Sequence, residues 1–281
     1  MDDKAAEQRA LELVAEGLAA EGRVLFLTGA GISAESGLPT FRGPEGYWSV
    51  GSRNYRPEEL ATFAAFSAMP AEVWAWYLYR RGVYRAARPN AAHDAITRAE
   101  QLLGDRFLLV SQNVDGLHER AGTSLARTHQ IHGNVEYCRC DDETPRLRKL
   151  PEGLPLDWPK AKKVGSSEEA LLRCCAREEW CRPHVLFFDE YYDEELFRWQ
   201  STIDAAQDAS VVIVIGTSGA TNLPTQVVSI AARRQIPLLV INRDESPFTH
   251  VARKERMGLF LQGSATEWVP RVVRGIQELR R

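Results

Sequence analysis

Three short segments carry glycine, amide, carboxylate and imidazole groups at spacings that suit nucleotide chemistry. The first begins after the apolar run 24–28, where the chain reads G-x-G-x-x-A from Gly29 to Ala34. Glycines at such a turn let backbone N–H groups approach a pyrophosphate without a Cβ in the way. The acidic residue that a dehydrogenase places after its second strand is missing, because the next segment, 39–43, reads PTFRG. The turn therefore suits a protein that binds a nucleotide but is not an ordinary dehydrogenase. By itself, such a glycine turn could also be purely structural.

The other two segments follow later in the chain and add polar side chains. Residues 111–118 read SQNVDGLH directly after the apolar run 107–111, and residues 131–133 read IHG. His132 offers an imidazole, which titrates near neutral pH and suits a general base. Both residues could instead have a structural role. His132 could be a hydrogen-bonded histidine in a turn, and Asp115 could cap a short helix that starts nearby.

Together these segments resemble the sirtuin family, the NAD-consuming protein deacylases. Residues 29–43, GAGISAESGLPTFRG, are similar to the sirtuin cofactor loop, and SQNVDGLH and IHG follow in the same order and at the same distances. RPHV at 182–185, GTS at 216–218 and IN at 241–242 extend the likeness to about residues 20–270. The resemblance implies that NAD is consumed and that the partner is acylated lysine of proteins or peptides. The implied products are nicotinamide, deacylated lysine and O-acyl-ADP-ribose.

The resemblance also implies roles for individual residues. In the family the acyl oxygen displaces nicotinamide, and a base then activates a ribose hydroxyl; His132 matches that base, and Asn113 is the second candidate catalytic residue. The residues implied in NAD binding come from the glycine turn, the SQNVD segment and the ends of later strands: Gly29, Ala30, Gly31, Ser33, Phe41, Arg42, Gln112, Asn113, Asp115, Gly216, Thr217, Ser218, Asn242 and Ala265.

The segment 71–83, AEVWAWYLYRRGV, bears on which acyl group is accepted. Tyr77 and Arg80 have the Y-x-x-R spacing that lines the acyl pocket in one sirtuin branch and pairs with an acidic acyl tail such as succinyl or malonyl. Residues three apart on a helix share a face, and a guanidinium can hold a carboxylate with two bonds. The alternative is an amphipathic helix with a solvated arginine. We expect the acidic-acyl pocket.

All five cysteines fall between residues 138 and 181. Sirtuins usually hold a structural zinc through two C-x-x-C pairs, whose thiolates tie together a module too small to fold on its own core. Cys140 and Cys174 occupy two of these positions, but Glu143 and Arg177 stand at the other two. Substitute thiols could come from the remaining cysteines, Cys138, Cys175 and Cys181. Zinc retention and zinc loss both remain open.

Two departures affect the segments that clamp the substrate peptide in the family. The first usually reads F-G-E, whereas here Asp189 takes the glycine position in FDE. The second reads TNLP at 221–224. A side chain and a charge beside the peptide path keep one rival open, an NAD hydrolase or ADP-ribosyltransferase that uses the same site. A second rival is a non-catalytic NAD or ADP-ribose binding module, against which His132 beside the intact QNVD segment argues.

Apolar runs that alternate with helical patterns must position these groups. Runs of strand length that are apolar on both faces occur at 24–28, 107–111, 211–215 and 238–242. Helical periodicity occurs at 4–20, 70–86, 90–103, 193–207, 223–234 and 266–279. The alternation predicts an α/β fold with a doubly wound parallel sheet, which the resemblance makes a Rossmann-type domain. We expect this domain to span 1–132 and 183–281, with a helical insertion at about 44–88 and a small Cys-rich module at 133–182.

Composition excludes several classes of function. The 281 residues hold 35 Lys plus Arg against 38 Asp plus Glu, so a net charge of −3 gives no reason to expect nucleic acid or an anionic membrane as partner. The central apolar run 211–215 is far shorter than the roughly 18 residues that cross a bilayer. Residues 1–20 mix acidic residues with Ala and Leu and lack the pattern of a secretory signal. We therefore expect a cytoplasmic protein.

Overall fold

Six short apolar strands pair in parallel to form the central sheet. The computed structural model describes residues 2–39, 48–50, 53–140, 147–160, 162–174 and 179–280. The sheet has the order β11-β10-β9-β1-β4-β5, and every neighbouring pair is parallel. Its strands are β1 Arg23–Thr28, β4 Phe107–Ser111, β5 Thr128–Gln130, β9 Ala209–Ile215, β10 Leu238–Asn242 and β11 Gly258–Gln262. In chain order this is the Rossmann arrangement, so the predicted fold class is confirmed.

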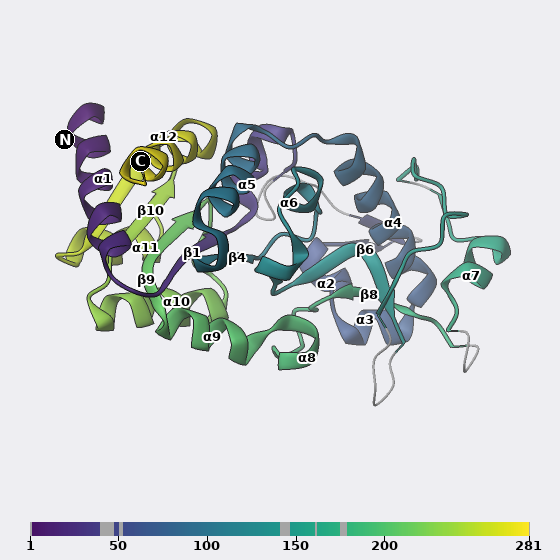
Figure 1. The fold of residues 1–281 in the computed structure, drawn as a ribbon. Helices are drawn as coiled ribbons and strands as arrows, with labels where there is room; N and C mark the ends of the chain where they lie inside the picture. The colour runs from purple at the N-terminus through teal and green to yellow at the C-terminus, as the bar shows by residue number, and fades with distance from the viewer. Residues whose placement is uncertain are drawn as a thin grey trace.

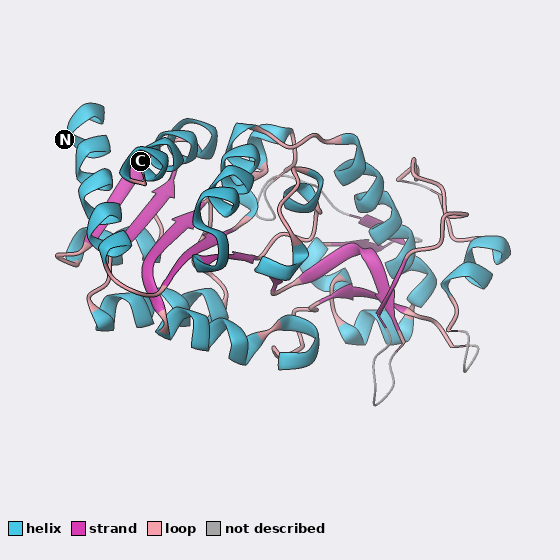
Figure 2. Cartoon of the chain, viewed as in Figure 1, coloured by secondary structure: helices cyan, strands magenta, loops and turns pink. Residues whose placement is uncertain are grey.

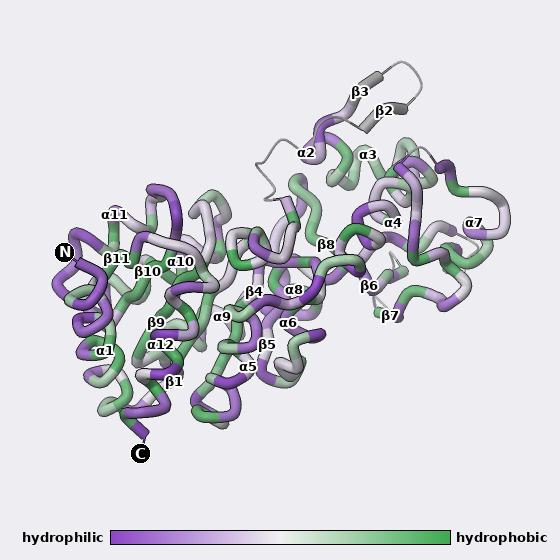
Figure 3. The backbone as a smooth tube through the Cα atoms, turned by 90° about the horizontal axis from the view of Figure 1, so that it is seen from above, coloured by the Kyte–Doolittle hydropathy of each residue, from purple (hydrophilic) through white to green (hydrophobic). Residues whose placement is uncertain are grey.

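Helices cover both faces of the sheet because its strands are apolar on both faces. In β1, Val24 and Phe26 join the core under one helical layer, while Leu25 and Leu27 join the core under the other. Figure 2 shows the two helical layers on either side of the strands, and Figure 3 shows the hydrophobic colours of the central strands. One layer comprises α1 Asp3–Ala19, α5 Ala91–Leu103 and α12 Ala265–Leu279; the other comprises α9 Trp199–Gln207, α10 Asn222–Arg234 and α11 Pro247–Lys254.

The four predicted strands and five of the six predicted helices appear as single elements close to their expected bounds. The sixth, expected at 193–207, is divided into α8 Glu194–Phe197 and α9, because Arg198 adopts a left-handed conformation with φ 56°. The sequence did not reveal β5, which has only three residues, or β11, in which buried positions alternate with less buried ones at the edge of the sheet.

A second, smaller unit lies beside the sheet domain and contains an antiparallel sheet (Figure 1). This sheet has the order β7-β6-β8, with β6 Gly133–Arg139, β7 Leu147–Lys149 and β8 Arg182–Val185. Its apolar residues form one core with the helices of the segment 57–86, and the Trp74 indole N–H donates to the carbonyl of Cys181 at 2.7 Å. The remaining elements are β2 Trp48–Val50, β3 Arg53–Tyr55, α2 Pro57–Leu60, α3 Phe63–Ala68, α4 Pro70–Ala86, α6 Leu117–Arg120 and α7 Ser166–Leu172.

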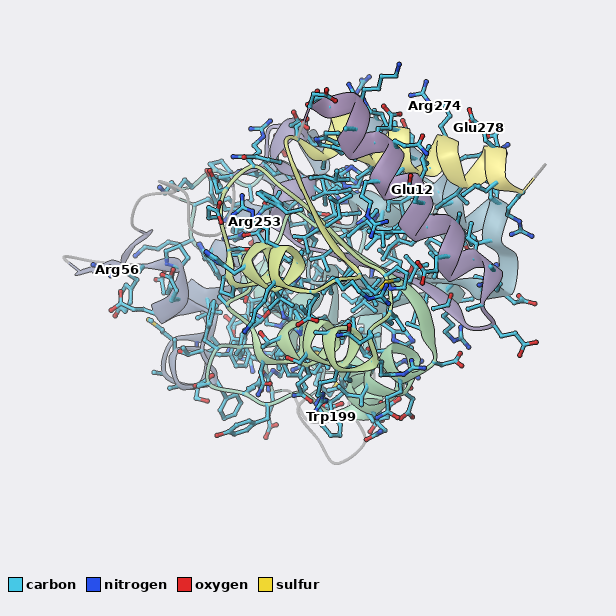
Figure 4. The ribbon with its side chains drawn as sticks, turned by 90° about the vertical axis from the view of Figure 1, so that its left-hand side faces the viewer. Glu12, Arg56, Trp199, Arg253, Arg274 and Glu278 are labelled. Atoms are coloured by element: carbon cyan, nitrogen blue, oxygen red, sulfur yellow. A yellow bond between two sulfur atoms is a disulfide. The ribbon has the colours of Figure 1, made fainter. Side chains whose placement is uncertain are left out.

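The outer surface of the sheet domain is charged. Figure 4 shows α1 and α12 side by side, with Glu12 on the face of α1 toward the viewer and Arg274 and Glu278 at the outer edge of the molecule. Within the described residues, none of the helices combines the length and the apolar character that a bilayer crossing would require.

Substitution of Gly133 tests how tightly the turn that carries His132 packs against β8. Gly133 and Gly37 share almost the same φ, 84° and 83°, but a Cβ on Gly133 would lie 2.1 Å from the His184 carbonyl oxygen, whereas a Cβ on Gly37 would meet nothing within 4 Å. Gly37→Ala should cost about 1–2 kcal/mol of unfolding free energy, the penalty for a left-handed residue with a Cβ. Gly133→Ala should cost at least about 2 kcal/mol more, because backbone must move.

Urea unfolding followed by circular dichroism measures both values. Equal losses for the two variants would show that the turn at Gly133 moves aside freely.

Candidate functional site

The carboxyl ends of four neighbouring strands bring the predicted cofactor residues to one edge of the sheet. Thr28 at the end of β1 is in register with Ser111 of β4 and with Ile215 of β9, which in turn pairs with Ile241 of β10. A cavity of about 1090 Å³ opens at this edge. Every predicted cofactor residue that the structure describes lines it, as do His132, Tyr77 and Arg80. Phe41 and Arg42 lie outside the described residues.

Two glycine turns touch at the floor of the cavity. The N–H of Gly31 donates to the carbonyl of Gly216 at 2.7 Å, and a Cβ on Gly31 would lie 2.6 Å from the Gly216 Cα. Gly216 itself has φ 61°. Only residues without a Cβ allow this approach, and both turns line the cavity.

Asp115 connects the glycine turn to the segment after β4. Its carboxylate accepts the Ser33 hydroxyl at 2.7 Å and the Leu117 N–H at 2.8 Å, where α6 begins. The amide of Asn113 donates to the Gly29 carbonyl at 3.1 Å. Burial raises the pKa of Asp115, although these two hydrogen bonds oppose the rise. Asp115 therefore supports the start of a short helix, which is the structural role considered for it from the sequence. It also contacts the loop predicted to hold NAD.

His132 presents one ring nitrogen to the polypeptide and the other to the cavity side. Its Nδ1 lies 2.9 Å from the Gln112 carbonyl oxygen, which can only accept, so Nδ1 carries the proton and Nε2 carries the lone pair. The Nε2 atom lies 2.8 Å from the hydroxyl of Tyr192. Burial lowers the pKa of His132 to about 4, against the opposing effect of the Gln112 carbonyl. The imidazole is therefore neutral and can accept a proton at Nε2.

The predicted acyl-selecting pair lies on α4 with both side chains buried. Arg80 is only 7% exposed, so the alternative of a solvated arginine is wrong. Its Nε donates to the Tyr84 hydroxyl at 2.7 Å, and its guanidinium lies over the Trp76 ring. The Tyr77 ring packs 6.1 Å from that of Phe187, and burial raises the Tyr77 pKa. A buried cation thus stands at the cavity wall beside a phenol hydroxyl.

The sequence of the chain matches a known protein family. A model of the Sir2 family matches residues 29–222, which is more than half of the chain. This protein belongs to the Sir2 family. The resemblance to sirtuins drawn from the motifs is therefore confirmed.

Individual members of the Sir2 family cover most of the chain. An NAD-dependent protein deacylase of Leptospira interrogans is 37% identical over 254 residues, 89% of this chain and 91% of that protein. The mitochondrial NAD-dependent protein deacylase sirtuin-5 of Danio rerio is 35% identical over 237 residues, 79% of this chain and 74% of that protein. A Sir2 homolog solved as an NAD complex aligns with a TM-score of 0.77 at 32% identity, covering 100% of this chain and 96% of that chain.

Asp189, which stands where sirtuins usually have glycine, has a structural role. The carboxylate of Asp189 accepts the N–H groups of Phe63 at 2.7 Å and Ala64 at 3.1 Å, at the start of α3. The following Glu190 forms an ion pair with the buried Arg182 of β8. Asp189 thus fastens the FDE segment to the small unit, so its charge is already paired with helix N–H groups.

The cysteines of this Sir2-family chain cluster beside β6. Cys140 and Cys174 form a disulfide, and the Cys181 sulfur lies 3.9 Å from that of Cys140. The Arg148 guanidinium lies 3.3 Å from the Cys181 sulfur. The neighbouring Cys138 thiol and the Arg148 guanidinium lower the pKa of Cys181, even though burial opposes this shift. Cys175 lies outside the described residues.

Sequence reasoning missed two tyrosines of the site. Tyr84 holds Arg80 from one helical turn further along α4, and a helical periodicity extended by four residues could have found it. Tyr192 contacts His132 from 60 residues away, and no spacing in the sequence pointed to that contact.

The pH dependence of stability tests the environment of His132. The folded imidazole titrates at about 4 but the unfolded one near 6.5, so unfolding takes up a proton between these values. The free energy of unfolding should therefore fall as the pH is lowered through this window, and His132→Gln should flatten the fall.

Melting temperatures at half-unit pH steps measure the difference. The other histidines with lowered pKa values, His93, His118, His129 and His184, are present in both proteins. An identical slope for the variant and the wild type would contradict an imidazole that stays neutral in the folded protein.

Proposed function

We propose that this protein is an NAD-dependent lysine deacylase of the Sir2 type. The observation that carries the proposal is the single cavity in which the two glycine turns and the segment from Gln112 to Asp115 meet the neutral imidazole of His132. The names of the relatives, which are NAD-dependent protein deacylases, support the same reaction.

In the proposed reaction, some residues of the chain bind NAD and His132 accepts a proton. NAD, as the cosubstrate, supplies a ribose carbon that loses nicotinamide and accepts the acyl oxygen. The turns of Gly31 and Gly216 line the cavity and are proposed to face the pyrophosphate, and Asn242 at the end of β10 is proposed to contact the adenosine ribose. His132 then accepts the proton of a ribose hydroxyl at Nε2, while the Gln112 carbonyl holds its Nδ1–H.

Tyr77 and Arg80 are proposed to select an acidic acyl group. A carboxylate at the end of a succinyl or malonyl chain would meet a guanidinium that is already buried and oriented by Tyr84 and Trp76. Because this cation is held away from water, pairing with a carboxylate is stronger there than at the surface.

The substrate is proposed to be acylated lysine within a protein or peptide. The peptide would lie as a strand between the FDE segment and the segment 221–224, a mode in which main-chain hydrogen bonds provide affinity. Asp189 does not argue against this mode, because its carboxylate is bonded to α3. We propose the cytoplasm as the compartment.

Replacing the base tests the reaction. His132→Asn removes the proton acceptor and should reduce acyl-lysine turnover by about 10²–10⁴-fold. Exchange of labelled nicotinamide into NAD should persist, because loss of nicotinamide precedes the step that needs the base. His250→Asn, on the exposed side of α11, is the control.

Mass spectrometry of peptides and nicotinamide provides both measurements. Nicotinamide release that does not depend on acyl-peptide would favour an NAD hydrolase instead. Full turnover by His132→Asn would remove His132 as the base.

Arg80 tests the acyl preference. Because a charged hydrogen bond is worth about 1.5–3 kcal/mol, Arg80→Met should lose roughly ten- to a hundredfold more kcat/KM on a succinyl-lysine peptide than on its acetyl counterpart. Arg81→Met is the matched control, since the neighbouring buried Arg81 pairs with Glu136 and should affect both substrates alike. Equal losses for Arg80→Met on both peptides would remove the acidic pocket.

The clustered thiols are proposed to hold a structural zinc when they are reduced. The sulfurs of Cys140, Cys174 and Cys181 lie within 4.8 Å of one another, and Cys138 contacts Cys181. Four thiolates suit tetrahedral Zn²⁺, and Arg148 would offset part of their charge. The metal would tie β6 to the strand and helix that flank the cysteines; it would supply no chemistry to the reaction. In a reducing compartment the disulfide would not persist, which favours the metal.

Metal analysis of the natively purified protein tests this site. We expect about one zinc per chain, and we expect a chelator to lower the melting temperature while a thiol reductant alone does not. Absence of zinc, with a melting temperature that falls on reduction, would show that the disulfide fastens the module instead.

A further inference from the structure

The segment after β8 places a tyrosine hydroxyl on the candidate base. Tyr192 lies between β8 and α8, three residues beyond Asp189, and its hydroxyl is 2.8 Å from Nε2 of His132. The two rings lie at 29° with centroids 5.8 Å apart. Since Nδ1–H is committed to the Gln112 carbonyl, Nε2 is the acceptor and the phenol is the donor. Burial raises the pKa of Tyr192, so the phenol keeps its proton.

A threonine from the second clamp segment reaches the same hydroxyl. Thr221 lies against the Tyr192 hydroxyl, and its own hydroxyl donates to Oε1 of Gln112 at 3.0 Å. His132, Tyr192, Thr221 and Gln112 therefore form a closed loop of contacts, which joins the imidazole to both segments between which a substrate peptide would lie. Thr221 belongs to the second segment in which this chain departs from the usual sirtuin pattern, and Tyr192 follows the first, FDE, by two residues.

We propose that Tyr192 masks His132 in the free protein: its hydroxyl occupies the Nε2 lone pair until an acyl-lysine peptide enters between the two segments. The inference rests on the proposed function and deepens it by naming what keeps the base unavailable without substrate. A strand of peptide placed between these segments must contact the loops that carry Tyr192 and Thr221. Entry of the substrate would therefore break the contact that covers Nε2.

The proposed mask would slow the hydrolysis of NAD by water, which is a side reaction. In the side reaction the oxygen of water bonds to the ribose carbon, the bond to nicotinamide breaks with its electron pair going to the nicotinamide nitrogen, and the water proton goes to a base. With Nε2 accepting the Tyr192 O–H, His132 is a weaker acceptor for that proton, because this hydrogen bond must first break. Among the described residues, Tyr192 is the only titratable side chain with a hydrogen bond or ring contact to His132, so no other such group can replace the mask.

Tyr192→Phe tests the mask because it keeps the stacked ring and removes the hydroxyl. Since one neutral hydrogen bond is lost, peptide-independent release of nicotinamide from NAD should rise about five- to tenfold. The matched control is Tyr137→Phe: Tyr137 lies on β6 away from the residues that line the cavity, so its change should leave the rate unchanged. A peptide-independent rate for Tyr192→Phe at or below that of the wild type would overturn the proposal.

A spectroscopic readout separates this inference from the proposed function and needs no catalysis. The ¹⁵N resonance of the unprotonated Nε2 of His132 should move in Tyr192→Phe, and it should move in the same direction when a succinyl-lysine peptide is added to the wild-type protein without NAD. A wild-type resonance that is insensitive to bound peptide would refute release of the mask, even if Tyr192→Phe did not fold. Lack of acyl-lysine turnover by a wild-type protein with an intact Tyr192 contact would instead count against the proposed function alone.

Discussion

The contact between two turns that lack side chains is the constraint on which the rest of the site depends. Gly31 and Gly216 approach so closely that a single Cβ at either position would collide with the opposite backbone. This approach follows from the parallel pairing of β1 with β9, because both strands deliver their turns to the same edge at the same height. The cavity for a dinucleotide exists because the sheet places two such turns side by side.

The small unit completes what the sheet edge begins. The sheet supplies the backbone floor and the polar groups after β4, whereas α4 supplies the buried Arg80 and Tyr77. One apolar core joins α4 to the antiparallel sheet of the cysteine segment. The Arg80 cation therefore lies on a helix that is packed on two sides, which is the condition for holding it away from water while it faces the cavity.

The polar groups of the FDE segment and of the segment 221–224 contact other parts of the chain. Asp189 holds the first segment to α3, Glu190 pairs with Arg182, and Tyr192 meets the imidazole. Thr221 links the second segment to Gln112. Departures that suggest a damaged peptide site when they are read along the chain thus form internal contacts in three dimensions.

Much of the fold could be predicted because its signals are local. The strands 24–28, 107–111, 211–215 and 238–242 are apolar on both faces, and helices of ordinary length separate them, so periodicity alone predicts a doubly wound sheet. The elements that were missed have weak local signals: β5 is only three residues long, and the αL residue Arg198 that divides a helix is not glycine.

The amino-acid sequence by itself determined the family, the glycine turns and the imidazole, because these depend on residue type and on spacing along the chain. Only the tertiary structure decided that Arg80 is buried, that the charge of Asp189 is used by a helix, and that Tyr192 covers His132. The reason is physical: burial and contacts between residues 60 or 126 positions apart depend on how separate elements pack, and that information lies in no local stretch of the chain.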